Sequence, residues 1–182
     1  MTKTIRFGAA GVAMFAALGL GTAAHADTAS ADATAEVLAA LTLTNTDELN
    51  FGTVVLNAGS TGGTVDIDPF GFRTCAGDVI CGPGAAEQAA GFNVTGATGT
   101  DVSVTLQDLV TNPVSLTHTG NVGSTNAEHN IELTSLVDST FAGGFFFFSG
   151  NEDFTVGGTI TLDGTEIAGV YEGTFDVTAE YQ

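Results

Sequence analysis

The most regular pattern of hydrophobic and polar positions lies near the C-terminal end of the chain, between residues 171 and 181. Acidic residues and threonines alternate there with a second set of positions: Tyr171, Gly173, Phe175, Val177, Ala179 and Tyr181. A period of two is typical of a β-strand that has one face in a core and the other in water. The pattern predicts one continuous strand over residues 171–181, whose apolar face must be covered by this chain or by a neighbouring one.

Shorter alternating segments recur along the chain, separated by turns rich in Gly, Asn and Asp. The first predicted strand spans residues 33–44, where a helix over residues 35–43 is the alternative because Ala and Leu favour helices. The threonine-rich end and the lack of a helix stop signal favour the strand. Further strands are predicted over residues 49–55, 64–68, 92–95, 102–106, 114–119, 130–134 and 154–162, and a loop over residues 69–84.

This arrangement of short strands indicates an all-β protein. After residue 26 no stretch keeps a helical period over three turns, and glycine is abundant while proline is scarce. Such a pattern is typical of an antiparallel β-sandwich or barrel. A membrane barrel would need apolar bands with aromatic girdles, whereas this chain has no Trp and both of its Tyr residues lie in the closing strand. We therefore predict a β-sandwich and no membrane insertion.

The N-terminal residues have the pattern of a cleaved export signal. Lys3 and Arg6 form a basic start, an apolar run rich in Ala and Gly follows, and Ala24-His25-Ala26 has the small-x-small form of a cleavage site. A transmembrane anchor needs about 20 strongly apolar residues, and this run is shorter and diluted by glycine. We predict a signal peptide over residues 1–26 and a single domain over residues 27–182. The expected location is the bacterial cell surface or exterior, reached through the periplasm.

The net charge of the exported chain excludes some classes of partner. After cleavage Arg73 would be the only Lys or Arg beside 21 acidic residues, which gives a net charge of −20. Nucleic acids and anionic membranes would be repelled by such a surface, so we expect neither as a partner. We interpret the acidity as a trait of solubility or habitat, and the sequence predicts no cofactor.

Cys75 and Cys81 are the only cysteines, with five residues between them. In an exported protein this spacing predicts a local disulfide. A loop this short removes little chain entropy, about 2 kcal/mol on a polymer model. The bond would fix a loop rather than hold the fold together.

Four consecutive phenylalanines form the most apolar run after residue 26: Phe145, Phe146, Phe147 and Phe148. Successive side chains of a strand point to opposite faces, so one covered face could not bury all four. A central strand or a plugged end of the sandwich is one interpretation. An assembly or adhesion patch is the other, since contiguous exposed apolar surface usually marks a contact.

Candidate ion sites and catalytic motifs are weak. Asp66 with Asp68, and the run 151–153, carry oxygen ligands suited to Ca²⁺, but neither forms a complete calcium loop. His118 and His129 are interpreted as surface or half-buried residues. The chain has no nucleophile elbow, zinc-protease motif or phosphate loop, and we predict that it is not an enzyme.

Three groups of residues carry a family resemblance. The first runs from Ala33 to Leu43 and on to Leu49-Asn50-Phe51-Gly52-Thr53. The second is Phe154-x-Val156-Gly157-Gly158-Thr159-x-Thr161-Leu162, and the third spans residues 169–181. Together they resemble a family of exported bacterial proteins catalogued as a domain of unknown function, which is similar to the spore-coat-U-like pilin subunits of chaperone–usher systems.

The resemblance implies an immunoglobulin-like, pilin-like sandwich that lacks one strand, which an N-terminal extension of the next subunit supplies. It also implies a periplasmic chaperone and an usher as partners, and Tyr181 matches the penultimate tyrosine of the chaperone-recognised end. The candidate extension, residues 27–35, offers the small side chains Ala29, Ala31, Ala33 and Ala35. Burying a methyl group releases less free energy than burying Val or Phe, so Val37 and Ala39 would have to take part.

The sequence thus leads to two functional hypotheses. The first is a non-enzymatic, exported structural or adhesive surface subunit that assembles with itself or with envelope partners by β-strand addition. Its candidate assembly residues are the four alanines together with Tyr171, Phe175, Val177 and Tyr181. The second is a self-complete secreted sandwich that binds calcium or a glycan.

Overall fold

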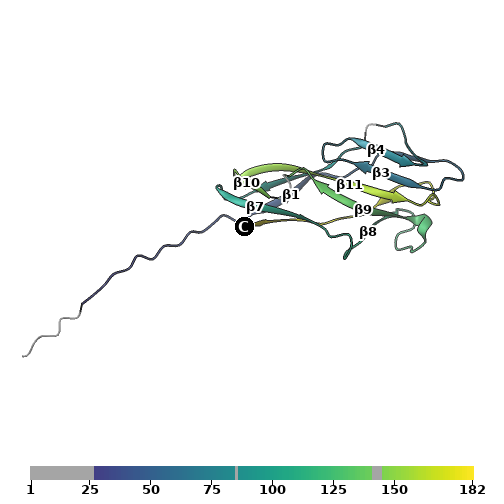
Figure 1. The fold of residues 1–182 in the computed structure, drawn as a ribbon. Helices are drawn as coiled ribbons and strands as arrows, with labels where there is room; N and C mark the ends of the chain where they lie inside the picture. The colour runs from purple at the N-terminus through teal and green to yellow at the C-terminus, as the bar shows by residue number, and fades with distance from the viewer. Residues whose placement is uncertain (1–26, 85, 141–144) are drawn as a thin grey trace, which may run out of the picture. The chain divides into compact units, whose positions relative to one another are not determined.

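The protein is described by a computed structural model that covers residues 27–84, 86–140 and 145–182, without the side chains of residues 145–147 (Figure 1). The predicted signal peptide, residues 1–26, lies outside the described residues. The chain divides into two units, with the boundary between Glu36 and Val37. In the first unit, residues 27–36 contain no strand and their side chains are exposed. The second unit, residues 37–182, holds all the strands described below.

The described residues form thirteen strands and one 3-10 turn. They are β1 (Thr42–Asp47), β2 (Val54–Leu56), β3 (Gly63–Ile67), β4 (Arg73–Gly77), β5 (Val79–Cys81), β6 (Ala90–Thr95), β7 (Thr100–Leu106), β8 (Val114–His118), η1 (Ala127–His129), β9 (Asn130–Asp138), β10 (Phe145–Phe148), β11 (Asn151–Leu162), β12 (Tyr171–Glu172) and β13 (Val177–Tyr181).

The strands form three antiparallel sheets. The large sheet has the order β1-β6-β11-β9-β8-β12, and β3 joins it by pairing with both β11 and β4. A second sheet has the order β10-β7-β13, and a third contains β2 and β5. The twelve-residue strand β11 is the centre of the large sheet, because its first half pairs with β6 and its second half with β3 and β9. The predicted all-β antiparallel sandwich is confirmed.

Two hydrophobic clusters fill the space between the sheets. One, the closed cluster, joins β6 and the first half of β11 to β7: Ala90, Phe92, Val94, Val102, Val104, Phe148, Phe154 and Val156. The other, the open cluster, lies on β3, β8, β9 and the second half of β11: Phe51, Val65, Ile67, Val79, Val114, Ile131, Leu133, Ile160 and Leu162. Each fully buried side chain of this size contributes about 1.5–3 kcal/mol to folding.

The closing segment is not the single strand that its alternation predicts. Tyr171 pairs with His118 of the large sheet, whereas Val177 to Tyr181 pair with β7 of the second sheet. Residues 173–176 lie between the two strands and outside any sheet. Tyr171, Phe175, Val177, Ala179 and Tyr181 are half-buried and the residues between them are exposed, Gly173 included, so the segment keeps one side toward the core while it passes from one sheet to the other.

The first strand begins later than predicted. It starts at Thr42, opposite Thr95, where β6 ends before the turn at Gly96. Because β6 extends no further, it offers no partner to the residues before Thr42. Val37 is 92 % exposed, and residues 33–40 have no strand structure. The alternation there is real, but a strand also needs a neighbouring edge.

The predicted loop over residues 69–84 is also wrong in part, because it contains β4 and β5. These strands are short and carry few large apolar residues, so their alternation is weak. The predicted disulfide is confirmed and joins Cys75 of β4 to Cys81 of β5. In the described parts of the chain, no helix has the length and apolar character needed to cross a membrane.

Candidate functional site

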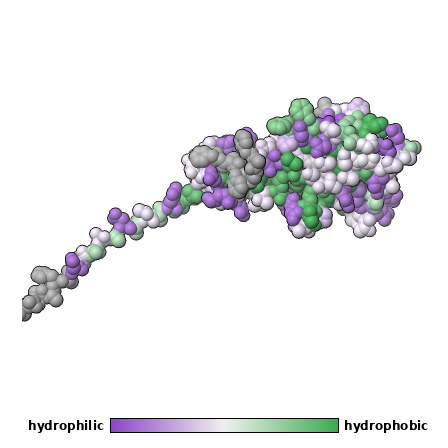
Figure 2. Space-filling model, in the orientation of Figure 1, coloured by the Kyte–Doolittle hydropathy of each residue, from purple (hydrophilic) through white to green (hydrophobic). Residues whose placement is uncertain are grey.

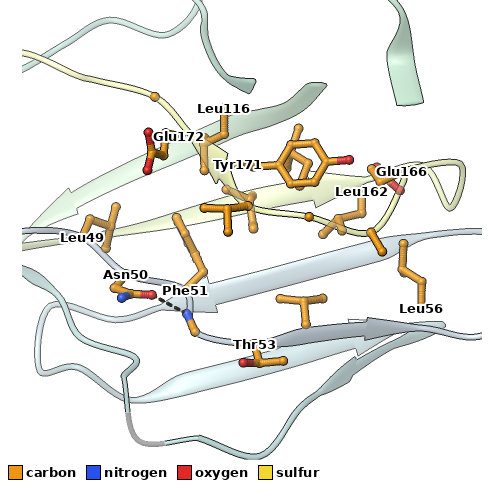
Figure 3. Close-up of a pocket in the computed structure, with 18 of the residues that line it drawn as sticks. Leu49, Asn50, Phe51, Thr53, Leu56, Leu116, Leu162, Glu166, Tyr171 and Glu172 are labelled. Carbon is orange, nitrogen blue, oxygen red and sulfur yellow. Dashed lines mark hydrogen bonds between the residues drawn. The ribbon is translucent and has the colours of Figure 1, made fainter. Parts of the chain in front are cut away.

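A large groove opens above the open cluster, between two strand edges. Within the described residues β2 pairs with β5 alone, and β12 is the last strand of the large sheet. The groove between them has a volume of about 1120 Å³. Its apolar lining includes Leu49, Phe51, Leu116, Ile131, Ile160 and Leu162. Figure 3 shows Leu49, Phe51 and Leu56 on one side of this space, and Leu116, Leu162 and Tyr171 on the other.

One side of the groove is formed by residues 48–56, called here the rim segment. Asn50 exchanges two backbone hydrogen bonds of 2.9 Å with Gln88. The N–H of Gly52 then donates to Asn50 Oδ1 at 2.8 Å, drawn as a dashed line in Figure 3. Gly52 has a φ of +71°, which favours glycine. The predicted strand over residues 49–55 is therefore interrupted, and only Val54–Leu56 form a strand, paired with β5.

The other side is formed by residues 166–174, called here the wall segment. The hydroxyl of Tyr171 lies 2.8 Å from the carbonyl oxygen of Ile167 and 2.9 Å from that of Glu128. The ring of His118 meets the Tyr171 ring edge-on, with 5.3 Å between centroids. Burial raises the pKa of Tyr171 above its ordinary value, and the charges of Glu166 and Glu128 add to this. The tyrosine thus fixes the wall through its neutral, hydrogen-bonding form.

The charged side chains along the groove are all acidic. Glu48, Glu166 and Glu172 line it, and no Lys or Arg is among the described lining residues. The carboxylate of Glu166 accepts hydrogen bonds from the N–H groups of Asp163 and Gly164. The groove therefore combines an apolar floor with acidic margins.

The predicted assembly residues of the closing segment lie in two different places. Tyr171 lines the groove, whereas Val177 and Tyr181 belong to β13 and pack against the closed cluster. Phe175 packs against both clusters. The hydroxyl of Tyr181 accepts a hydrogen bond from Ala97 N at 2.6 Å and donates to Ala39 O at 3.0 Å. Tyr181 thus anchors the chain just before β1.

The predicted assembly residues near the N-terminus lie in the first unit. Ala29, Ala31, Ala33 and Ala35 are exposed in a segment without secondary structure. The phenylalanine run forms β10, which pairs with β7. Phe148 is fully buried in the closed cluster, and the side chains of Phe145, Phe146 and Phe147 lie outside the described part of the structure.

The candidate ligand residues have local partners. Asp66 accepts a hydrogen bond from Thr159, and Asp153 accepts one from Asn93. The rings of His118 and His129 are 6.4 Å apart, and His129 Nδ1 lies 2.7 Å from Ser124 Oγ. Ser124 Oγ also accepts the N–H of Asn126, which makes it part of a local turn. Among the side chains that the structure describes, no three His, Cys, Asp or Glu gather to hold a metal ion.

Two surface features were not predicted from the sequence. The rim segment was not predicted as an edge of a groove, because its strand is interrupted and its apolar residues have the pattern of core residues. Phe70 and Phe72, 79 % and 71 % exposed, lie in the turn after β3. Both of their N–H groups donate to Asp68 Oδ1 at 2.9 Å, which orders the turn that carries them. Figure 2 shows apolar residues among the polar ones on the visible face of the second unit.

The fold and the groove define an antiparallel β-sandwich with a gap between two strand edges in the layer over its open cluster. The chain belongs to the family described as a domain of unknown function (DUF4402), whose model matches residues 41–181. A search of curated proteins finds no match. The match leaves the N-terminal unit out and includes every strand of the second unit.

Proposed function

We propose that the protein is an exported structural or adhesive surface subunit, similar to the pilin subunits of chaperone–usher systems, that assembles by β-strand addition. The observation that carries the proposal is the groove between β2 and β12. Within the described residues β2 pairs with β5 alone and β12 is the last strand of its sheet, so an extended segment could pair with each of them, and the space between them has an apolar floor.

An extended peptide segment is the occupant that can use both the strand edges and the apolar floor of the groove. Main-chain hydrogen bonds along an edge supply affinity, and alternate side chains of the added strand fill the groove. Leu116 and Leu49 are half-buried in the groove, so an inserted strand would remove further apolar surface from water at about 25 cal/mol per Å². Covering both edges also removes two sites at which unpaired strands aggregate.

The proposed donor is the N-terminal unit of a neighbouring copy. The described residues of this unit are exposed and unpaired. In an extended strand Ala29, Ala31, Ala33 and Ala35 would share one face, and Val37, the first residue of the second unit, would continue it. Tyr181 donates a hydrogen bond to the carbonyl of Ala39, which marks the point where the free segment ends. A periplasmic chaperone would cover the groove before assembly.

The test compares two faces of the donor. Replacing Ala29, Ala31, Ala33 and Ala35 with Asp should abolish heat- and SDS-resistant multimers, because these side chains would enter the apolar groove. Replacing the alternate residues Thr28, Ser30 and Thr34 with Asp is the matched control and should leave multimers in place. Multimers that resist both changes, or that survive deletion of residues 27–35, would contradict the proposal.

A further inference from the structure

The rim segment is attached to the molecule in an unusual way. Its strand β2 pairs with β5, and this two-stranded sheet shares no strand pairing with the other two sheets among the described residues. β2 and β5 have only three residues each. An isolated two-stranded pair of this length is only marginally stable by itself, although Val79 is buried in the open cluster and Val54 and Leu56 pack against it. The Asn50–Gln88 bridge holds the start of the rim, so further contacts are needed to fix the rim between this bridge and β2.

Arg73 supplies the first attachment. Its guanidinium donates to Phe51 O at 3.1 Å and to Thr53 O at 3.2 Å through Nη1, and to Gly82 O at 2.8 Å through Nη2. Nη2 also lies 3.6 Å from Glu87 Oε1, and the Arg73 side chain is only 7 % exposed. One side chain of β4 thus binds the rim at two carbonyls and the chain beyond β5 at a third. The planar guanidinium can make such a set of bonds, whereas a lysine ammonium carries a single nitrogen.

The disulfide supplies the second attachment. Cys75 of β4 lies opposite Val65 of β3, in the large sheet. Cys81 of β5 lies opposite Val54 of the rim segment. The Cys75–Cys81 bond therefore connects the large sheet to the strand that carries the rim, two residues along β4 from Arg73. Both attachments approach the rim from the side away from its unpaired edge.

We propose that Arg73 is a positioning residue and that, with the Cys75–Cys81 disulfide, it holds the rim segment at the spacing required by an incoming strand. The inference rests on the proposed function, since it assigns these residues a role in strand uptake. Adjacent strands lie about 4.7–4.9 Å apart, so a rim that fluctuates by a few ångströms would lose the pairing on one side. A rim that is already positioned lowers the ordering entropy that is lost when the strand binds.

The test uses the full exported chain and a synthetic peptide with the sequence of residues 27–41 as the probe. Arg73→Met keeps an unbranched apolar stem and removes every donor, while Arg73→Lys keeps the charge. We expect Arg73→Met to speed amide hydrogen exchange at Val54–Leu56 at least tenfold and to weaken peptide binding at least tenfold. Arg73→Lys should fall between this variant and the wild type, and Cys75→Ser with Cys81→Ser should weaken binding in the same direction.

Asn93 provides the control, because its side chain donates to Asn151 and Asp153 on β11 and does not line the groove. Asn93→Ala should leave rim exchange and peptide binding unchanged. Wild-type rim exchange and peptide binding in Arg73→Met, or in Arg73→Lys if the first variant does not fold, would overturn the inference. A wild-type chain that neither binds the peptide nor forms multimers would instead refute the proposed function, and its rim exchange would still decide whether Arg73 holds the rim.

Discussion

The two ends of the second unit differ in how the large sheet is covered. At the closed cluster, β7 and β13 lie over β6 and β11 as neighbouring strands of one sheet, and Tyr181 ties β13 to Ala39 and Ala97. At the open cluster, the cover consists of the rim on one side and the wall on the other, with the groove between them. The same sheet is therefore covered by paired strands at one end and bordered by a groove at the other.

The largest contrast is expected from truncating a large side chain in each region. Phe154 is 5 % exposed and stacks on Phe92 with 5.3 Å between centroids. Phe154→Ala should cost about 3–5 kcal/mol in the free energy of unfolding because it leaves a cavity. Leu116→Ala should cost about 1 kcal/mol, since water already reaches that side chain in the groove. Denaturant unfolding measures both losses, and equal losses would show that the groove is no less packed than the closed cluster.

Removing the Tyr181 hydroxyl should likewise cost more stability than removing the Tyr171 hydroxyl. Tyr181→Phe leaves the N–H of Ala97 without its acceptor, and an unsatisfied donor of this kind costs about 1–3 kcal/mol. Tyr171→Phe removes only a donor to the carbonyls of Ile167 and Glu128, for which about 0.5–1.5 kcal/mol is expected. Thermal or denaturant unfolding ranks the pair, and a larger loss for Tyr171→Phe would reverse the comparison.

As pH rises, the wall of the groove should lose stability at a lower pH than the closed cluster does. The pKa of Tyr171 is raised in the folded protein above its ordinary value of 10.0. The folded state therefore holds this proton more tightly than the unfolded state, and stability falls as pH rises above 10. Amide exchange over residues 166–172 should increase there, and Tyr171→Phe should lack this component. The same alkaline response in that variant would assign it to another group.

Acid should produce the smallest effect, next to the rim. Hydrogen bonds from the backbone and side chain of Thr61 lower the pKa of Asp78 below 3.8. This carboxylate contributes stability above pH 3.8, and the contribution is lost as pH falls through its lowered folded pKa. Asp78→Asn should make stability slightly less dependent on pH below 3.8. An unchanged acid profile in that variant would show that the Thr61 contact contributes nothing measurable.

The sequence predicted the strands whose neighbours are also strong strands. Val102, Val104 and Leu106 alternate with polar residues, and β7 is covered on both edges by β10 and β13. The strand from Phe154 to Leu162 was predicted for the same reason. Local alternation and sheet pairing agree at these positions, so the alternation alone was sufficient to predict the strands.

The groove could not be predicted because it depends on which edges remain unpaired. Residues 33–40 alternate well but have no neighbouring edge, whereas β4 and β5 alternate poorly but are held by pairing, Arg73 and the disulfide. The alternation over residues 171–181 correctly assigned each side chain to its face. It could not show that the segment changes sheets near Gly173, since both halves keep the same period.

The most direct test of the account is amide hydrogen exchange at both edges of the groove, compared between monomers and SDS-resistant multimers of the same chain. If a donated strand lies between β2 and β12, exchange at Val54–Leu56 and at residues 171–174 should slow together in the multimer, while exchange across β7 stays the same. Unchanged exchange at both edges in the multimer would contradict strand addition at this groove.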